Sequence, residues 1–441
     1  MARFFSNNFG DILKAAFAKK DNSNNNPAGL QNNEIPVIVG IDFGTSFTKA
    51  YCNIAGDNRP VEFNVGNETS YFLPSEVYYD KKGKILSLEQ RTHTERICYF
   101  KYNMINDELK LPYEPVQEVP FDIVCSVFFL SRVIGMVIEH ASQRLPGKKL
   151  KFHFNMGCPI ANEDSKFKGT YDKALNAAYE LNKQSKGEIE NVDRVATLYK
   201  LNESKSNALL RTVPELYAEA LWFINKSTTD EGIYTILDIG GGTVDYATIA
   251  IQRENGIKRT DIYSHGAKPL GIEILLKKFY PNECQGNRNE CLEKLSRSDI
   301  KIPSHDKDNP LVDVQHVYGN AFEALFFQGV MDAKQIRPHL MKRLFDARPR
   351  QLIPYYSYGG GADVNWFHSI IDQHNGFIET AGIPKLHRNK VGTDLPSNRL
   401  IVAFQLAQPS LPDIGKFPWE FKKIPHAFVD LEIPDYLLID D

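Results

Sequence analysis

The sequence predicts an α/β protein in which one strand–turn–strand unit occurs twice. From Ile35 onward, short apolar segments alternate with longer segments whose apolar residues follow the helical period. The two similar units begin near Val37 and Tyr234, about 200 residues apart, and a third glycine-rich strand end follows at Tyr358. This spacing indicates a duplicated architecture rather than a tandem sequence repeat.

Composition narrows the class of protein. The 441 residues are sufficient for two or three domains, and 42% hydrophobic with 24% charged residues is typical of a soluble globular chain. A net charge of −3 gives no reason to expect nucleic-acid binding. The six cysteines are scattered and form no CxxC motif, which favours reduced thiols and a cytoplasmic location.

No apolar stretch reaches the length of a membrane span. The most apolar run, between Val124 and Val137, is interrupted by Ser126, Ser131 and Arg132, so we expect a buried helix there. Residues 1–34 are distinct: an amphipathic segment precedes an asparagine-rich linker. That segment is expected to dock on a partner or membrane surface, or to pack on its own domain.

The remaining pattern predicts the elements in order. We expect strands over 35–42, 48–54, 150–158, 194–201, 234–238, 243–252 and 355–358. We expect helices over 121–144, 164–185, 213–225, 271–279, 320–333, 337–347 and 366–372. The last 30 or so residues are rich in proline and predict a wrapping tail.

The first strand–turn–strand unit is suited to binding phosphate. A fully apolar strand ends at Asp42, and Gly44 can adopt a positive φ and let phosphate oxygens approach the backbone. Thr45 and Ser46 add hydroxyl donors. Because a carboxylate cannot lie beside polyphosphate without a cation, Asp42 implies Mg²⁺, held directly or through water.

The second unit repeats this logic. An apolar strand ends at Asp238, three glycines and Thr243 follow, and a second strand begins with Asp245. A third element, the glycine triplet after Tyr358, lets a flat group lie against bare backbone. Together the three elements predict a site for a nucleotide and Mg²⁺.

With these motifs in this order, the chain resembles the actin/Hsp70/hexokinase ATPase superfamily, and most closely the Hsp70 nucleotide-binding domain. Further similar segments are Pro74-Ser75, Gly157-Cys158-Pro159, the Glu215 helix and the segment from Leu400 to Ala407. The resemblance implies a two-lobed actin-like ATPase fold of duplicated ribonuclease H-like domains, with a nucleotide cleft between the lobes. It implies an N-terminal segment over 1–34, lobe I over 35–230, lobe II over 231–399, and a connecting helix and tail over 400–441.

The resemblance also implies roles for single residues. Asp42 and Asp238 would hold Mg²⁺, Glu215 would orient a metal-bound or attacking water, Asp245 would lie near that water, and Lys101 would reach the γ-phosphate. The residues that would bind the ATP or ADP are Gly44, Thr45, Ser46, Gly240, Gly241, Gly242, Thr243, Gly359, Gly360 and Gly361. For Lys101 and Glu215, a surface lysine and a solvated helix charge are the alternatives.

The implied activity is slow ATP hydrolysis by in-line attack of water, with lobe closure as the useful output. Because the sequence ends about 30 residues after the second connecting helix, we expect an Hsp70-like protein without the peptide-binding domain, which switches a protein partner by its nucleotide state. An actin-like filament protein, a small-molecule kinase of the same superfamily and a scaffold without turnover are the alternatives. The segment around Cys291 aligns poorly with the family's adenine-binding helix, so the choice between ATP and GTP stays open.

Overall fold

The computed structural model describes residues 34–273 and 353–421, with gaps in both ranges. The gaps are 66–67, 105–110, 160–165, 186, 188, 203–206, 208, 226–230, 255–256, 269–270, 363–366, 369–385, 390–397, 410 and 412–418. The predicted amphipathic segment and linker, the helices over 320–333 and 337–347, and most of those over 271–279 and 366–372 lie outside the described residues. So does the segment around Cys291.

The chain divides into two compact units. The first unit comprises Met1–Glu219 and Leu400–Phe417, and the second comprises Ala220–Arg399 and Pro418–Asp441.

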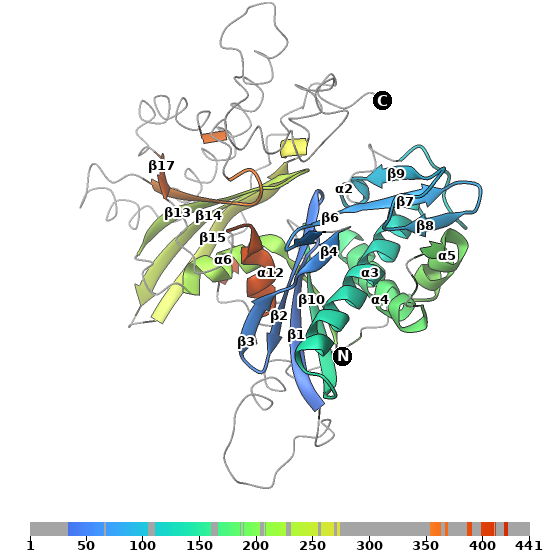
Figure 1. The fold of residues 1–441 in the computed structure, drawn as a ribbon. Helices are drawn as coiled ribbons and strands as arrows, with labels where there is room; N and C mark the ends of the chain where they lie inside the picture. The colour runs from blue at the N-terminus through green and yellow to red at the C-terminus, as the bar shows by residue number, and fades with distance from the viewer. Residues whose placement is uncertain are drawn as a thin grey trace, which may run out of the picture. The chain divides into compact units, whose positions relative to one another are not determined.

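The first unit is built on a mixed sheet with the strand order β3-β2-β1-β10-β12 (Figure 1). Its strands are β1 (Glu34–Asp42), β2 (Phe47–Ile54), β3 (Asp57–Pro60), β10 (Lys149–Cys158) and β12 (Leu210–Pro214), and the short β6 (Leu73–Pro74) pairs with β2. β1 to β3 are antiparallel neighbours, whereas β10 runs parallel to β1 and β12 parallel to β10. The sheet therefore has an antiparallel half and a parallel half, joined at β1.

Alternate residues of β1 face opposite sides of the sheet, and helices pack on both sides. Val37, Val39 and Ile41 of β1 belong to the buried core shared with α3 (Phe121–Arg144) and α4 (Lys166–Gln184). On the opposite face, Gly40 lies against α12 (Ile401–Leu406), which follows a 3₁₀ turn, η1 (Asn398–Leu400). The remaining helices are α2 (Phe100–Asn103), α5 (Val192–Leu201) and α6 (Glu215–Asn225), which starts directly after β12.

A second, antiparallel sheet and a hairpin complete the described part of this unit. The sheet has the order β11-β8-β7-β9, and the hairpin joins β4 to β5. Their bounds are β4 (Phe63–Val65), β5 (Glu68–Ser70), β7 (Glu76–Asp80), β8 (Ile85–Ser87), β9 (Glu95–Cys98) and β11 (Ile189–Asn191).

The second unit has a mixed sheet of matching topology. Its strands are β13 (Gly232–Ile239), β14 (Val244–Glu254), β15 (Ile257–Lys268), β16 (Ile353–Tyr358), β17 (Leu386–Asn389) and β18 (Trp419–Phe421), in the order β17-β16-β13-β14-β15-β18. β13, β14 and β15 are antiparallel neighbours, and β16 and β17 add in parallel beside β13. The path β15-β14-β13-β16-β17 thus repeats β3-β2-β1-β10-β12 in both order and direction. The predicted α/β class and duplicated architecture are confirmed at this level.

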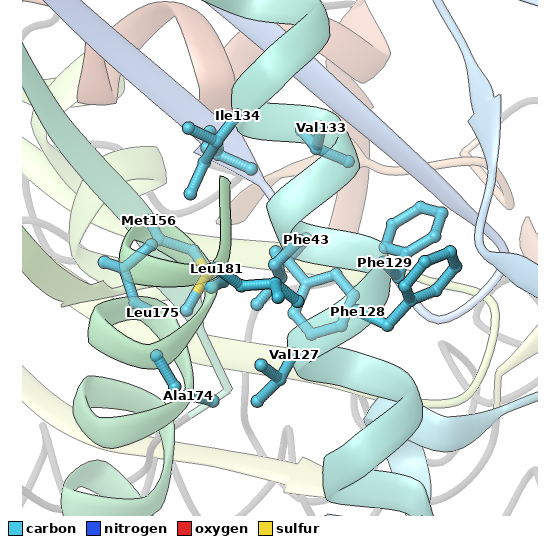
Figure 2. Close-up of a cluster of buried hydrophobic side chains, with 14 of the residues drawn as sticks. Phe43, Val127, Phe128, Phe129, Val133, Ile134, Met156, Ala174, Leu175 and Leu181 are labelled. Carbon is cyan, nitrogen blue, oxygen red and sulfur yellow. The ribbon is translucent and has the colours of Figure 1, made fainter. Parts of the chain in front are cut away.

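The long apolar helix predicted over 121–144 is α3, with the predicted bounds. By length and composition α3 could cross a membrane, but most of its apolar window is buried inside the first unit. Phe128, Phe129 and Val133 are fully buried there (Figure 2). The prediction of a buried helix is confirmed.

The strand predicted over 194–201 is wrong, because these residues form α5. Val192, Val195, Ala196 and Tyr199 are buried at helical spacing, and a window that starts at Arg194 omits the first of them. Asn191 caps the helix: its side-chain oxygen accepts from the Asp193 N–H at 2.9 Å.

The helix predicted over 213–225 begins two residues later, at Glu215. Val213 and Pro214 instead end β12, where Pro214 pairs with Cys158 of β10. β12 is the last strand on its side of the described sheet, and an edge strand tolerates a proline, which has no N–H to donate. This shift matters because it puts Glu215 immediately after a strand end.

Gly40 sets how closely α12 packs on β1. A Cβ at Gly40 would lie 2.1 Å from the Ala403 carbonyl oxygen and 2.7 Å from the Ala407 nitrogen. Asn155 of β10 adds a hydrogen bond from its Nδ2 to the Leu406 carbonyl at 2.7 Å. Backbone, rather than a flexible side chain, therefore blocks any larger residue at position 40.

We predict that Gly40→Ala destabilises the first unit by about 1–3 kcal/mol, the usual cost of overpacking. Urea unfolding followed by circular dichroism measures this. The matched control is Gly169→Ala in the exposed part of α4, where a Cβ would meet nothing within 4 Å and alanine favours the helix. Equal unfolding midpoints for the two variants would contradict the close packing.

His153 of β10 is 4% exposed, and burial lowers its pKa to about 4, with a smaller effect of Lys151. The folded chain therefore keeps His153 neutral at pH values where the unfolded chain, with a pKa near 6.5, binds a proton. The resulting stability is fully present above pH 6.5 and is lost as the pH falls from there towards 4.

We predict a loss of about 2 kcal/mol of unfolding free energy between pH 7.5 and pH 5 from this one histidine. His153→Gln removes the titrating group, so the variant should show a flatter dependence of stability on pH. Urea midpoints measured at both pH values test this, and parallel pH profiles for wild type and variant would refute it.

Candidate functional site

Three parallel strands of the first unit end at the same edge of its sheet. β1 ends at Asp42, β10 at Cys158, and β12 at Pro214, which Glu215 follows. Ligand sites of open α/β sheets lie at the carboxyl ends of such strands. The register therefore brings two acids that are 173 residues apart in sequence, Asp42 and Glu215, to one sheet edge.

Asp42 forms a buried ion pair with Lys49. The two residues are direct partners on β1 and β2, and Lys49 Nζ lies 2.7 Å from Asp42 Oδ2. Their side chains are only 11% and 9% exposed. The same ammonium lies 3.6 Å from the position that a Cβ of Gly44 would occupy, so it stands beside the glycine turn.

The turn that follows β1 is held by Ser75. The Ser75 hydroxyl donates to the Gly44 carbonyl at 2.7 Å, and the Ser75 N–H donates to the Ser46 carbonyl at 3.0 Å. The described chain has no cis peptide bond, and a trans peptide points each C=O opposite to the next N–H. The Thr45 N–H therefore points away from Ser75. The positive φ expected at Gly44 is wrong, and the Gly44 N–H donates to the Asp42 carbonyl at 3.1 Å.

Lys101 and Glu215 form a second buried ion pair in the first unit. Lys101 Nζ lies 2.8 Å from Glu215 Oε1, and the side chains are 6% and 9% exposed. The Glu215 side chain extends over Gly157, where a Cβ would lie 2.8 Å from Glu215 Cγ. Neither the surface-lysine alternative for Lys101 nor the solvated-charge alternative for Glu215 fits this burial.

Backbone strain and packing orient Lys101. Tyr99, which precedes α2, has a φ of 64°, a left-handed conformation that is unusual for an aromatic residue. The hydroxyl of fully buried Tyr171 donates to the Lys101 carbonyl at 3.2 Å. Lys101 Nζ also lies 5.7 Å from the ring centre of Phe43, which is anchored among α3 side chains (Figure 2).

Cys158 lies beside this pair but is not a nucleophile. Burial raises the pKa of its thiol, and the negative charges of Glu215 and Asp172 raise it further. The thiol therefore remains protonated, and a protonated thiol is a poor nucleophile. This agrees with chemistry in which water, rather than a side chain, is the attacking group.

In the second unit, two acids face each other across the hairpin. Asp238 of β13 and Asp245 of β14 are direct partners in the antiparallel register, and Asp245 is buried. Thr243 Oγ1 donates to Asp245 Oδ2 at 3.4 Å. Like charges at directly opposed positions destabilise a hairpin unless a cation compensates them. Carboxylate oxygens are also the ligands that Mg²⁺ prefers, so this donor set fits that ion.

In the glycine loop between β13 and β14, the carbonyls of Gly240, Gly241 and Gly242 all accept hydrogen bonds from one segment. Residues 271–273 donate backbone N–H groups to it: Gly271 to the Gly242 oxygen at 3.1 Å, Ile272 to the Gly240 oxygen at 3.0 Å, and Glu273 to the Gly241 oxygen at 2.7 Å. Because the peptides are trans, the N–H groups of Gly241, Gly242 and Thr243 point to the other side. We therefore interpret this side of the loop as a candidate anion-binding nest.

The glycine triplet after β16 packs against the end of β13. A Cβ at Gly359, which has a φ of 79°, would lie 2.0 Å from Asp238 Oδ1, and one at Gly361 would lie 2.1 Å from Ile239 Cγ2. Of the three, Gly360 faces the Arg399 guanidinium at 3.5–3.7 Å. Two of the glycines thus have a packing reason, whereas a Cβ at Gly360 would make only an ordinary contact with Arg399.

A buried histidine holds the segment after the triplet. His368 Nε2 lies 2.8 Å from the Ala362 carbonyl, and Nδ1 lies 3.0 Å from the Tyr355 hydroxyl. Since a carbonyl only accepts, the Nε2–H donates and Nδ1 accepts from the tyrosine. The imidazole therefore ties the triplet to β16.

The predicted site residues thus fall into two sets, which we call the first and second half-sites. The first half-site contains Asp42, Gly44, Thr45, Ser46, Lys101 and Glu215; the second contains Asp238, Gly240, Gly241, Gly242, Thr243, Asp245, Gly359, Gly360 and Gly361. Sequence reasoning missed Lys49, Ser75 and residues 271–273. Lys49 could have been found by aligning the two units, because Lys49 and Asp245 each lie seven residues after the strand-ending aspartate.

Comparison with known proteins adds nothing to this geometry: neither the protein-family models nor the curated proteins searched include a match to the chain.

We predict that Gly271→Ala weakens anion binding to the second half-site by at least about tenfold, since each hydrogen bond to a charged group stabilises by about 1.5–3 kcal/mol. A Cβ there would lie 2.3 Å from the Gly241 oxygen and would displace the loop. Calorimetric titration with inorganic tripolyphosphate measures the effect. The control is Gly232→Ala in β13, where a Cβ makes only an ordinary contact at 3.4 Å. Equal affinities for the two variants would contradict the nest.

Proposed function

We propose that this chain is a slow Mg-ATPase of the actin/Hsp70/hexokinase type that switches a protein partner by its nucleotide state. One observation carries the proposal. Two sheets share a strand path, and each has an aspartate at or next to the end of its central strand, β1 or β13, before a glycine turn whose carbonyls accept hydrogen bonds from another segment. Duplicated turns of this kind suit a ligand with several phosphates.

The described residues support a division of tasks on the bound triphosphate. The N–H groups of Gly241, Gly242 and Thr243 would bind phosphate oxygens from one half-site, and the turn from Gly44 to Ser46 from the other. Mg²⁺ would supply charge neutralisation between phosphate oxygens and the carboxylates of Asp238 and Asp245. Asp42 would join this set only after it separates from Lys49.

Glu215 and Lys101 are suited to the hydrolytic step. Lys101 would place a positive charge on the γ-phosphate, and Glu215 would accept a hydrogen bond from the attacking water. Both side chains are buried, so their charges act where water screens them little. Catalysis would come from positioning and charge, without a covalent intermediate, and the rate would be low.

The base would lie at Gly360, beside the Arg399 guanidinium. A flat ring can stack on bare backbone and on a guanidinium plane, and neither contact distinguishes adenine from guanine strongly. Adenine is therefore proposed from the resemblance, whereas the phosphate and metal parts are also supported by the contacts within each unit.

We predict that Asp238→Asn and Thr243→Ala each lower the rate of phosphate release by about 100-fold or more, because each removes a charge or donor that acts on the transferred group. Phosphate release from Mg-ATP is measured on wild type and variants. Lys84→Gln, which removes an exposed lysine paired with Asp193, is the control and should match wild type.

Two further measurements discriminate among functions. Pull-down of partners in ATP and in ADP should give different sets if the chain is a switch. Nucleotide-dependent pelleting would favour an actin-like filament instead. A wild-type chain that neither binds nor hydrolyses any nucleotide would overturn the proposal.

A further inference from the structure

The two hairpins place opposite charges at equivalent positions. In the second unit, Asp238 is opposed by Asp245 across β13 and β14. In the first unit, Asp42 is opposed by Lys49 across β1 and β2. The second half-site therefore has two acids at these opposed positions, whereas the first has an acid and a base.

Lys49 lies where its ammonium could pair first with the Asp42 carboxylate and then with a phosphate at the Gly44 turn. Its ammonium lies 2.7 Å from Asp42 Oδ2 and 3.6 Å from the Cβ position of Gly44, at the turn proposed to bind phosphate. A lysine ammonium has three donors on a flexible stem, so a small movement suffices to change its partner. The pair is nearly buried, and a buried charge that loses its partner must find another.

We propose that Lys49 is a built-in counter-ion that keeps Asp42 from binding a divalent cation until a polyphosphate takes over its ammonium. This inference rests on the proposed function, because the polyphosphate is the group that completes the exchange. Metal and nucleotide then bind the first half-site as a pair: the ammonium passes from the carboxylate to phosphate oxygens, and the carboxylate becomes available to the metal.

The same exchange of partners is expected for the Lys101–Glu215 pair. Its atoms are 2.8 Å apart and its side chains are also buried. Two carboxylates and two ammoniums leave these four groups with no net charge. A divalent cation alone would bring two positive charges close to both lysines, and a polyphosphate alone would bring its negative charges close to both carboxylates. Both separate events are unfavourable in a poorly screened site, whereas the two ligands together satisfy all four groups.

The test measures metal binding without turnover. Mn²⁺ replaces Mg²⁺, and free Mn²⁺ is followed by electron paramagnetic resonance in titrations of wild type, Lys49→Gln, Lys49→Arg and the double variant Lys49→Gln/Asp42→Asn. Each titration is run with and without inorganic tripolyphosphate, at concentrations corrected for the Mn²⁺ that tripolyphosphate binds itself. Circular dichroism checks that each variant is folded, and Lys49→Met replaces Lys49→Gln if the latter is not.

Without tripolyphosphate, Lys49→Gln should bind Mn²⁺ at least about tenfold more tightly than wild type, because the carboxylate has lost its competitor. The gain should be absent in the double variant, which lacks that carboxylate, and in Lys49→Arg, which keeps the cation. Tripolyphosphate should raise the Mn²⁺ affinity of wild type strongly and that of Lys49→Gln by a smaller factor.

Two results would overturn the exchange alone: equal Mn²⁺ affinities of wild type and Lys49→Gln without tripolyphosphate, or a wild-type affinity that tripolyphosphate leaves unchanged. Wild type is also titrated with Mg-ATP. If it binds no Mg-ATP, the proposed function fails, and the exchange fails with it. If it binds Mg-ATP while either of the first two results holds, the function stands and the exchange is wrong.

Discussion

The direction of the loop carbonyls is the constraint on which the candidate site depends. A glycine turn offers N–H groups to an anion only if its carbonyls are satisfied elsewhere, since each peptide plane points the two groups in opposite directions. In the second unit the N–H groups of residues 271–273 donate to the loop carbonyls, and in the first unit Ser75 donates to the carbonyls of the turn. The glycines alone are compatible with many turn conformations. The segment that donates to the turn carbonyls selects one of these conformations.

A charge difference then distinguishes the two otherwise equivalent hairpins. Lys49 neutralises Asp42 within the first unit, whereas in the second unit Asp238 is opposed by a second acid, Asp245. A duplicated fold usually keeps its packing while its functional positions diverge, because packing tolerates few changes and a strand end tolerates many. The seventh residue after each aspartate is such a position.

Local sequence patterns predicted most of the fold that positions the site. β1, α3 and β10 were recognised, since each has a long apolar pattern, and β16 was recognised as a short strand before the glycine triplet. α5 was mistaken for a strand because its pattern is short and its first buried residue, Val192, lay outside the window. The local signal for β12 was likewise weak, and its pairing with β10, which lies some 50 residues earlier, decides its conformation.

The candidate site was predicted where motifs are contiguous and missed where contacts are distant. The glycine turns and their aspartates are local signals. Ser75 lies 31 residues after Gly44, and Gly271 lies 29 after Gly242, so no short motif connects them. Gly359 and Gly361 show the opposite limit: they were expected to face a ligand, yet they also allow β16 to end against Asp238 and Ile239. A run of glycines in a sequence does not indicate which neighbouring group requires the absence of a side chain there.

The contribution of the two buried ion pairs to the stability of the first unit does not explain their presence. Taking two charges out of water costs several kcal/mol per ion, and a well-packed apolar pair of the same volume is often more stable. The first unit also has an extensive apolar core around Phe43, Phe129 and Met156 (Figure 2). Tyr99 adds strained backbone two residues before Lys101. Both the strain and the buried charges therefore cost stability, which is the condition that the proposed exchange of partners requires.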